Sequence, residues 1–268
     1  MTDPIRVFRE LHASGCFVMP NPWDAGSARA LQQFGFRALA TTSAGFAWSI
    51  GKADNHVTLE DVLAHLRQIV RSVTLPVNAD FEGGFATSPR DVGANVVRAA
   101  ETGIAGLSIE DSTGDAGAPL FDFSLAVERI AAARRALDDL GTGVVLTARS
   151  EGFVRGRPDL DETSRRLVAY SEAGADCLFA PGLRTQEQIV SIVRAVAPKP
   201  VNVIGTGVFA AAELAAMGVR RISVGGALAR TAWAGFLAAA REIAEHGTFS
   251  AFSGAASAAD LNGRFARD

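Results

Sequence analysis

The chain contains few cysteines and histidines, and their positions argue against several classes of site. Two cysteines occur among 268 residues, Cys16 and Cys177, and they form no CxxC pair. This spacing argues against a disulfide framework and a structural zinc site, and it is typical of the reducing cytoplasm. Of the four histidines, His12, His65 and His246 fall on expected helices or their ends. We therefore expect buried thiols, a cytoplasmic location and no zinc.

Long apolar runs and blocks of one charge are also missing. No stretch approaches the roughly 18 apolar residues of a membrane span, and residues 1–10 carry charges where a signal peptide needs an apolar core. The 26 basic and 29 acidic residues leave a net charge of −3, and the basic residues form no stripe. A small molecule is therefore the expected partner, rather than nucleic acid or a membrane.

The sequence does contain a regular alternation of short apolar runs with longer helical patterns. Hydrophobic residues make up 48% of the chain, which supports one large domain able to bury about three quarters of its unfolded surface. The expected strands are Phe17 to Pro20, Ala38 to Ser43, Val77 to Asp80, Gly106 to Glu110, Val144 to Ala148, Asp176 to Ala180, Val201 to Ile204 and Arg221 to Val224. This alternation predicts βα units around a parallel sheet.

Helix-start signals support the alternation. Thr58 to Asp61 and Thr185 to Gln188 resemble capping boxes, and Ser88-Pro89 offers an N-cap followed by proline. Eight units favour a (β/α)₈ TIM barrel. An open doubly wound sheet is the alternative, but residues 21–24 replace the glycine fingerprint that should follow its first strand. We assign residues 1–245 to the barrel and 246–268 to an additional helical arm that can pack on a neighbouring subunit.

A barrel should gather its chemistry at the carboxyl ends of its strands. Polar residues follow five of the expected strands in this sequence. They are Thr41 to Gly45, Asp80-Phe81-Glu82, Glu110-Asp111, Arg149-Ser150-Glu151, and Asn202. The sequence therefore predicts that these five groups converge on one mouth.

The acidic residues at this mouth predict a metal site. A single acid at a strand end is more often a helix cap or a solvated charge, but Asp80, Glu82 and Glu110 would project into the same space. Clustered carboxylates repel one another unless a cation offsets their charge. Because the ligands are all oxygens, Mg²⁺ or Mn²⁺ is expected in preference to zinc.

Arg149 and the Ser43-Ala44-Gly45 turn are the candidates for binding substrate. Arg149 follows an apolar run, so its guanidinium should reach the mouth, where it either forms a structural ion pair with Glu151 or Glu110 or binds a substrate carboxylate or oxyanion. The Ser-Ala-Gly turn offers a hydroxyl and accessible N–H groups, although it is also a common turn sequence.

Together these motifs resemble the isocitrate lyase and phosphoenolpyruvate mutase superfamily, from about Phe17 to Gly226. The motifs are residues 21–29, 42–45 with 51–54, 78–84, 108–111, 148–151 and 173–176. The resemblance implies a Mg²⁺-dependent barrel that acts on small 2-oxo or 2-hydroxy acids and makes or breaks bonds next to an enolate. It also implies a homo-oligomer, a dimer or tetramer, in which neighbours exchange a C-terminal helix.

The resemblance further implies a role for each candidate residue. The metal ligands, directly or through water, would be Asp80, Glu82 and Glu110. The substrate contacts would be Ser43, Ala44, Gly45, Arg149 and Asn202. The catalytic residues would be Arg149, which contacts the oxygen that becomes the enolate, and Asp54, which lies close behind the metal.

Two departures from the superfamily pattern bear on the reaction. Thr113 to Pro119 replaces the cysteine-bearing loop of the isocitrate lyases, and Ala180-Pro181-Gly182 replaces the glutamate or histidine expected after strand six. The glycine-rich loop still resembles a mobile lid, with Thr113 and Asp115 as its polar residues.

The remaining expectation is a carbon–carbon lyase for a small 2-oxo or 2-hydroxy dicarboxylic acid, such as oxaloacetate or a substituted malate. Its metal would stabilise the enolate. The enzymatic alternative is a phosphonopyruvate hydrolase or mutase-like P–C bond enzyme, with Thr113 near the phosphonate. The third is a metabolite-binding barrel without turnover.

Overall fold

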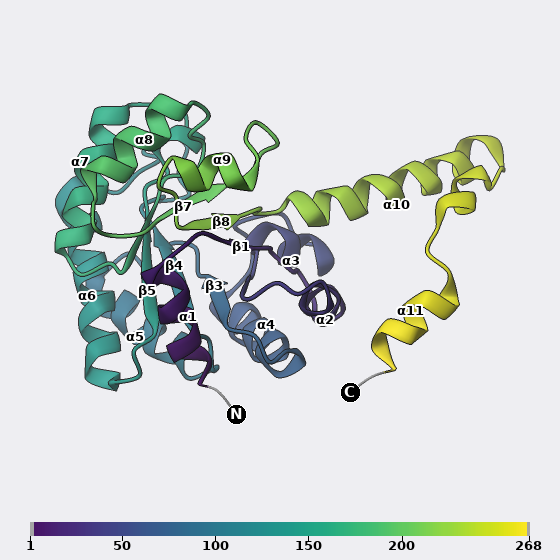
Figure 1. The fold of residues 1–268 in the computed structure, drawn as a ribbon, viewed down its shortest axis with the longest axis horizontal. Helices are drawn as coiled ribbons and strands as arrows, with labels where there is room; N and C mark the ends of the chain where they lie inside the picture. The colour runs from purple at the N-terminus through teal and green to yellow at the C-terminus, as the bar shows by residue number, and fades with distance from the viewer. Residues whose placement is uncertain (1–2, 267–268) are drawn as a thin grey trace.

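The computed structural model describes residues 3–266, which contain eight parallel strands in one nearly closed barrel (Figure 1). The strands are β1 (Phe17–Met19), β2 (Leu39–Ala40), β3 (Val77–Asp80), β4 (Gly106–Glu110), β5 (Val145–Arg149), β6 (Cys177–Phe179), β7 (Val201–Ile204) and β8 (Arg221–Ser223). Each pairs in parallel with the next from β2 to β8, and β8 pairs with β1. The Ala40 amide donates to the Pro20 carbonyl at 3.1 Å between the two end strands. The predicted TIM barrel is confirmed.

Helices alternate with the strands, and most of them cover the outside of the barrel. They are α1 (Pro4–Ala13), α2 (Ala25–Gln33), α3 (Ser43–Ser49), α4 (Leu59–Ser72), α5 (Pro89–Ala100), α6 (Phe123–Leu140), α7 (Leu160–Glu172), α8 (Gln186–Ala195), α9 (Ala211–Ala216), α10 (Ala227–His246) and α11 (Ala258–Phe265), with 3₁₀ turns η1 (Gly152–Val154) and η2 (Ser250–Gly254). The predicted starts of α4, α5 and α8 are confirmed, because Thr58, Ser88 and Thr185 accept the capping amide hydrogen bonds.

The second expected strand shows the largest difference from the prediction. The run from Ala38 to Ser43 forms a strand only as far as Ala40. Thr42 instead adopts the N-cap position of α3, where its hydroxyl accepts a hydrogen bond from the Gly45 amide at 3.3 Å. The cap turns the chain away from the sheet and makes Ser43 the first helical residue at the barrel mouth.

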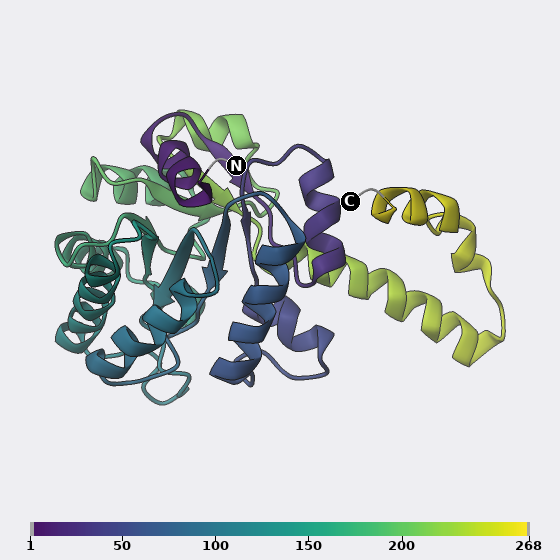
Figure 2. The same cartoon turned by 90° about the horizontal axis from the view of Figure 1, so that it is seen from below.

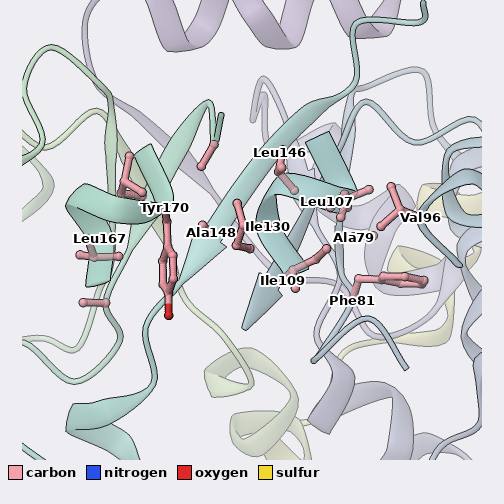
Figure 3. Close-up of a cluster of buried hydrophobic side chains, with 14 of the residues drawn as sticks. Ala79, Phe81, Val96, Leu107, Ile109, Ile130, Leu146, Ala148, Leu167 and Tyr170 are labelled. Carbon is pink, nitrogen blue, oxygen red and sulfur yellow. The ribbon is translucent and has the colours of Figure 1, made fainter. Parts of the chain in front are cut away.

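The main hydrophobic core lies between the barrel and its helices. Figure 3 shows Leu107 and Leu146, from adjacent strands, near Val96 of α5 and Ile130 of α6, and all four are at most 3% exposed. Successive residues of a strand point to opposite faces. The strand residues that alternate with these outward-facing ones therefore face the barrel interior. Several of these are buried and polar: Asn78, Ser108, Thr147, Asn202 and Arg221. The interior below the mouth is therefore polar.

Helix α1 closes the opposite end of the barrel. Its Phe8 is fully buried and lies so close to Gly106 that an added Cβ there would stand 2.6 Å from the ring. Its His12 contacts Nη1 of Arg221 at 3.2 Å. Cys177 is buried as expected, whereas the expectation was wrong for Cys16, which is half-buried because it directly precedes β1 at this end.

The chain ends in a helical arm, as predicted, but it leaves the barrel before residue 246. Figure 1 shows α10 projecting away from the barrel, and Figure 2 shows the chain returning through α11. Gln33 at the end of α2 donates a hydrogen bond to the Arg264 carbonyl at 2.6 Å. Residues 267 and 268 of the predicted arm lie outside the described residues. Across residues 3–266, no helix combines the length and apolar character needed to cross a membrane.

Candidate active site

The barrel mouth encloses a cavity of about 190 Å³ at the carboxyl ends of the strands. Six predicted site residues line it: Ser43, Ala44, Asp54, Asp80, Arg149 and Asn202. Glu110 adjoins it through an ion pair with Arg149. Gly45 lies behind this wall, where an added Cβ would stand 3.2 Å from the Cβ of Ala229. The five polar strand ends therefore converge as the sequence predicted.

Asp80 occupies a central position at the end of β3. Its Oδ2 accepts hydrogen bonds from both the amide and the hydroxyl of Ser43, each at 2.9 Å. Its Oδ1 accepts one from Nη1 of Arg149 at 3.1 Å. The Asp80 amide donates to the Thr41 hydroxyl at 2.9 Å. The carboxylate is thus fixed between the start of α3 and the end of β5.

Arg149 lies among three carboxylates. Nη1 is 3.3 Å from Oε2 of Glu110 and 3.1 Å from Asp80, and Nε donates to Oε1 of Glu151 at 2.5 Å. Burial works against its charge, but Glu151, Glu110 and Asp80 raise its pKa above the usual range. The ion pairs with Glu151 and Glu110, which the sequence indicated as one alternative for Arg149, are present. They hold the guanidinium at the cavity and keep it positively charged.

Glu82 sits beside this group in an unusual backbone conformation. Its φ is 46°, in the left-handed region that non-glycine residues rarely adopt. Its Oε1 is buried without a hydrogen-bond partner. Burial, followed by the charges of Asp80 and Asp54, raises the pKa of Glu82 to about 8. Burial also raises the pKa of Glu110, although Arg149 opposes the shift.

The composition of this group fits a hydrated divalent cation. Its carboxylates are Asp54, Asp80, Glu82, Glu110 and Glu151, which face the guanidinium groups of Arg149 and Arg155. The acids therefore exceed their basic partners, and one buried carboxylate oxygen has no donor. Nowhere in residues 3–266 do three His, Cys, Asp or Glu side chains converge closely enough to bind one ion directly. Mg²⁺ usually keeps several waters and binds one or two carboxylates, which this arrangement allows.

Ser43 and Gly45, which were predicted to contact substrate, form hydrogen bonds within the protein. The Ser43 amide and hydroxyl both donate to Asp80, and the Gly45 amide donates to Thr42. Ala44 lines the cavity beside Ser43. Asn202 lines it too, but its amide nitrogen donates to Ser223 and its carbonyl accepts from Arg221. In this conformation Ser43 therefore orients Asp80, and Asn202 belongs to the polar barrel interior.

The loop predicted as a lid follows β4, and its two ends are paired. Ser112 and Leu120 form an antiparallel bridge, and the Thr113 amide donates to the Pro119 carbonyl at 3.1 Å. The Thr113 hydroxyl donates to the Ala118 carbonyl at 2.6 Å and accepts from the Asp115 amide at 3.0 Å. The polar side chains predicted for the lid therefore form hydrogen bonds within it.

Sequence reasoning missed Arg155 and gave Asn21 no role. Arg155 follows η1, and its Nη2 lies 3.4 Å from Oε1 of Glu110. Asn21 donates to the Thr41 carbonyl at 2.9 Å and accepts from the Gly225 amide at 3.0 Å, which joins the ends of β1, β2 and β8. Arg155 lies beyond the strand end, so strand position gave no signal for it, whereas Asn21 directly follows an expected strand.

Comparison with known proteins assigns the family. The profile of the family described as phosphoenolpyruvate phosphomutase matches residues 8–244. The chain belongs to this family. An uncharacterized protein of Mycobacterium tuberculosis H37Rv is 33% identical over 81% of both chains. The 2-methylisocitrate lyase of Escherichia coli K12 is 34% identical over 58% of this chain and 54% of its own. An oxaloacetate decarboxylase of Rhodopseudomonas palustris BisB5 is 29% identical over 69% and 65%.

Solved structures extend the likeness to the whole fold. A Burkholderia cenocepacia J2315 protein described as a lyase/mutase is 48% identical, with a TM-score of 0.94, over 98% of this chain and 95% of its own. The 2,3-dimethylmalate lyase structure is 28% identical, with a TM-score of 0.87, over 98% and 95%. These relatives are lyases or mutases of the phosphoenolpyruvate mutase and isocitrate lyase superfamily, and the chain is an enzyme of this type.

Proposed function

We propose that this protein is a Mg²⁺-dependent lyase that cleaves a carbon–carbon bond in a small 2-oxo or 2-hydroxy dicarboxylic acid. The observation that carries the proposal is the position of Arg149 at the cavity, between Asp80 and Glu110. A charged guanidinium there can stabilise negative charge that develops on a substrate oxygen. The related 2,3-dimethylmalate lyase and oxaloacetate decarboxylase support this reaction class.

Asp80, Glu82 and Glu110 are the residues that would hold the ion, at least partly through water. When bound, Mg²⁺ or Mn²⁺ would supply Lewis-acid stabilisation of the enolate that carbon–carbon cleavage leaves behind. Ser43 orients Asp80 through two hydrogen bonds, so it prepares one ligand before the ion arrives. Glu151 anchors Nε of Arg149 and directs the rest of the guanidinium toward Asp80 and Glu110.

The groups that line the cavity indicate how a substrate would bind. Ala44 and Ser43 lie where a carboxylate would meet the first turn of α3, and Arg149 offers the fixed charge opposite. Asp54 lines the same cavity from the loop after α3 and is placed to accept a proton. The cavity of about 190 Å³ suits a small substrate. The lid would exclude water from it when closed.

The segment after β6 limits which reactions the site can catalyse. Ala180 and Pro181 are buried there and carry no acid or base. Decarboxylation of oxaloacetate needs no dedicated carbon acid at this position, because solvent can protonate the enolate after the bond breaks. A P–C bond reaction is the second candidate, supported by the family profile and by a B. cenocepacia phosphonomutase structure at 36% identity.

A substrate panel tests the proposal. The purified protein is incubated with Mg²⁺ and oxaloacetate, substituted malates, isocitrates or phosphonopyruvate, and products are identified by NMR with a chelated control. We expect metal-dependent pyruvate or another 2-oxo acid from a dicarboxylate. Phosphate or phosphoenolpyruvate from phosphonopyruvate alone would favour the P–C enzyme. Saturable binding without any product would favour a metabolite-binding barrel.

We also propose that the protein is a cytoplasmic homo-oligomer, a dimer or tetramer, assembled through its C-terminal arm. Large apolar side chains on the arm are exposed: Phe236, Leu237, Ile243, Phe249, Phe252, Leu261 and Phe265. A gap of about 1190 Å³ lies between α11 and the ends of α2 and α4. A neighbour's arm could cover the apolar side chains and fill the gap. Its two free cysteines suit a reducing compartment.

A further inference from the structure

The loop after β3 holds Glu82 in a strained conformation. Two of its non-glycine residues, Glu82 and Phe85, have φ values of 46° and 55°, and Gly84 between them has a φ of 74°. A left-handed non-glycine residue is strained and persists only where its surroundings enforce it. The conformation that brings Glu82 to the carboxylate group therefore needs a specific restraint.

Arg129 of α6 supplies a restraint through its guanidinium. It donates hydrogen bonds to three carbonyls of the loop, those of Gly83, Ala86 and Thr87, the last two at 2.6 and 2.9 Å. Asn95 donates to the Gly84 carbonyl at 2.9 Å and completes the set. Arg129 is 1% exposed, and within residues 3–266 it forms no ion pair, although the charges of Asp111 and Glu110 also favour its ionised form. A buried arginine is costly to desolvate, so its hydrogen bonds must compensate.

The same guanidinium also contacts the base of the lid. Its Cζ lies 3.9 Å from the ring centroid of Phe121, over the face of the ring. Phe121 lies just after the lid, and its amide donates to the Asp111 carbonyl at 2.9 Å. Asp111 directly follows Glu110. Arg129 is therefore in contact with both the loop that carries Glu82 and the segment from which the lid extends.

We propose that Arg129 is a positioning residue that holds Glu82 in its metal-binding conformation and links that conformation to the base of the lid. This inference rests on the proposed metal-dependent function. Arg129 faces carbonyl oxygens and an aromatic ring rather than the cavity, so it acts through Glu82. A lysine at this position would keep the charge but lose the planar fork that reaches several carbonyls.

Mn²⁺ binding is measured by electron paramagnetic resonance without substrate. It distinguishes a role of Arg129 in positioning Glu82 from a role in stabilising the fold. Arg129→Met should weaken Mn²⁺ binding about 10-fold to 100-fold, the usual effect of removing a residue that supports a metal ligand. Arg129→Lys should fall between Arg129→Met and the parent protein. In the Glu82→Gln background, Arg129→Met should have little further effect, because the ligand it positions is already altered.

Arg134→Met is the matched control. Arg134 lies on the same helix, is largely buried and pairs with Asp138 and Asp176 at 2.8 and 3.0 Å. It touches neither the loop after β3 nor the lid, so its loss should lower stability without changing Mn²⁺ affinity. Hydrogen exchange should show faster amide exchange across residues 81–87 and 111–121 in Arg129→Met but not in Arg134→Met.

Two outcomes would overturn the inference. One is a folded Arg129→Met protein with unchanged Mn²⁺ affinity and unchanged exchange in both segments. The other is an equal loss of affinity in Arg134→Met. If Arg129→Met fails to fold, Phe121→Leu removes only the ring contact and should still increase exchange in residues 81–87; no increase would refute the link. If the parent protein binds no Mn²⁺, the proposed metal function fails, and hydrogen exchange alone decides whether Arg129 holds the loop.

Discussion

The backbone carbonyl of Glu82 accepts a hydrogen bond from the backbone amide of Glu110 at 2.9 Å. The end of β4 and the loop after the neighbouring β3 are thereby joined through the main chains of these two acids, although their negative charges repel. This main-chain hydrogen bond helps to hold the two acids together, and Arg149 compensates part of the charge of Glu110. The cluster is therefore assembled at a cost in stability, which several variants should reveal.

Replacement of Arg149 should affect both activity and stability. Arg149→Met removes the charge that faces Asp80, Glu110 and Glu151, so turnover should fall by about 10²–10³, as for an oxyanion donor. The uncompensated buried acids should also lower the free energy of unfolding by about 3–5 kcal/mol near pH 7. Kinetics and urea unfolding measure the two effects. Adding Glu151→Gln should restore part of the stability but none of the activity; full activity in Arg149→Met would exclude the assigned role.

Removal of the metal should have a reversible effect. We expect a chelator to abolish turnover and Mg²⁺ or Mn²⁺ to restore it. Because an ion that binds only the folded protein stabilises it, the melting temperature should rise with metal concentration. Glu82→Gln should reduce that rise, since it removes a carboxylate from the group. An equal rise in Glu82→Gln and the parent protein would show that the ion binds elsewhere.

Acid should destabilise the protein through two buried histidines. Burial, with Arg221 as the next cause, lowers the pKa of His12 to about 3, and burial lowers that of His65 to about 4. Both are lowered from 6.5, so the unfolded chain binds more protons once the pH falls below that value. The contribution of the two histidines to stability should therefore decline from pH 6.5 toward pH 4, by at most about 1.4 kcal/mol per pH unit for each histidine.

Urea unfolding of the chelated protein at several pH values measures this decline. His65→Gln should make the slope between pH 6.5 and pH 4 shallower. Glu82 acts in the opposite direction, because its raised pKa of about 8 makes stability increase as the pH falls from 8 toward 4.5. This window overlaps that of the histidines, so the contribution of His65 is the difference between the parent protein and His65→Gln. A slope unchanged in His65→Gln would contradict the assignment of His65 as a buried neutral group.

The lid should depend on the Thr113 hydroxyl. This hydroxyl joins the Ala118 carbonyl to the Asp115 amide, so Thr113→Val should loosen the loop while global stability changes by less than about 0.5 kcal/mol. We expect faster proteolytic cleavage within residues 113–119 and a few-fold lower kcat/KM. Thr248→Val, in the distant arm, is the control. Unchanged proteolysis would show that these hydrogen bonds do not hold the loop.

Assembly should depend on the apolar arm. Phe236 and Phe249 are about 60% exposed, and replacing both with serine should shift the protein toward monomers without unfolding the barrel. Light scattering coupled to gel filtration measures the change. Arg241→Ser, a polar change on the same helix, should leave the mass unaffected. A monomeric parent protein would refute the proposed oligomer.

Strand periodicity and the positions of strand ends predicted much of this site. Asp80, Glu110 and Arg149 stand directly at the ends of β3, β4 and β5, so the parallel alternation was enough to bring them together. The left-handed φ of Glu82 has no sequence signature in a non-glycine residue. Arg155 reaches the site through a 3₁₀ turn, which strand periodicity does not describe.

Arg129 was overlooked for a different reason. On α6, Ala126, Arg129, Ile130 and Ala133 form one buried helical stripe, so an arginine in an apolar face was a visible anomaly. Its partners are carbonyls more than 40 residues away in sequence. Helical periodicity could indicate that the side chain is buried, but only the tertiary structure identifies what it holds.

The closure of the barrel by α1 has a consequence for kinetics. With Phe8 and His12 packed across the far end, reactants and products must exchange through the mouth that faces the lid. A product that leaves the cavity slowly blocks the binding of the next substrate molecule. We therefore expect a 2-oxo acid product to act as a competitive inhibitor, so that the rate slows as product accumulates.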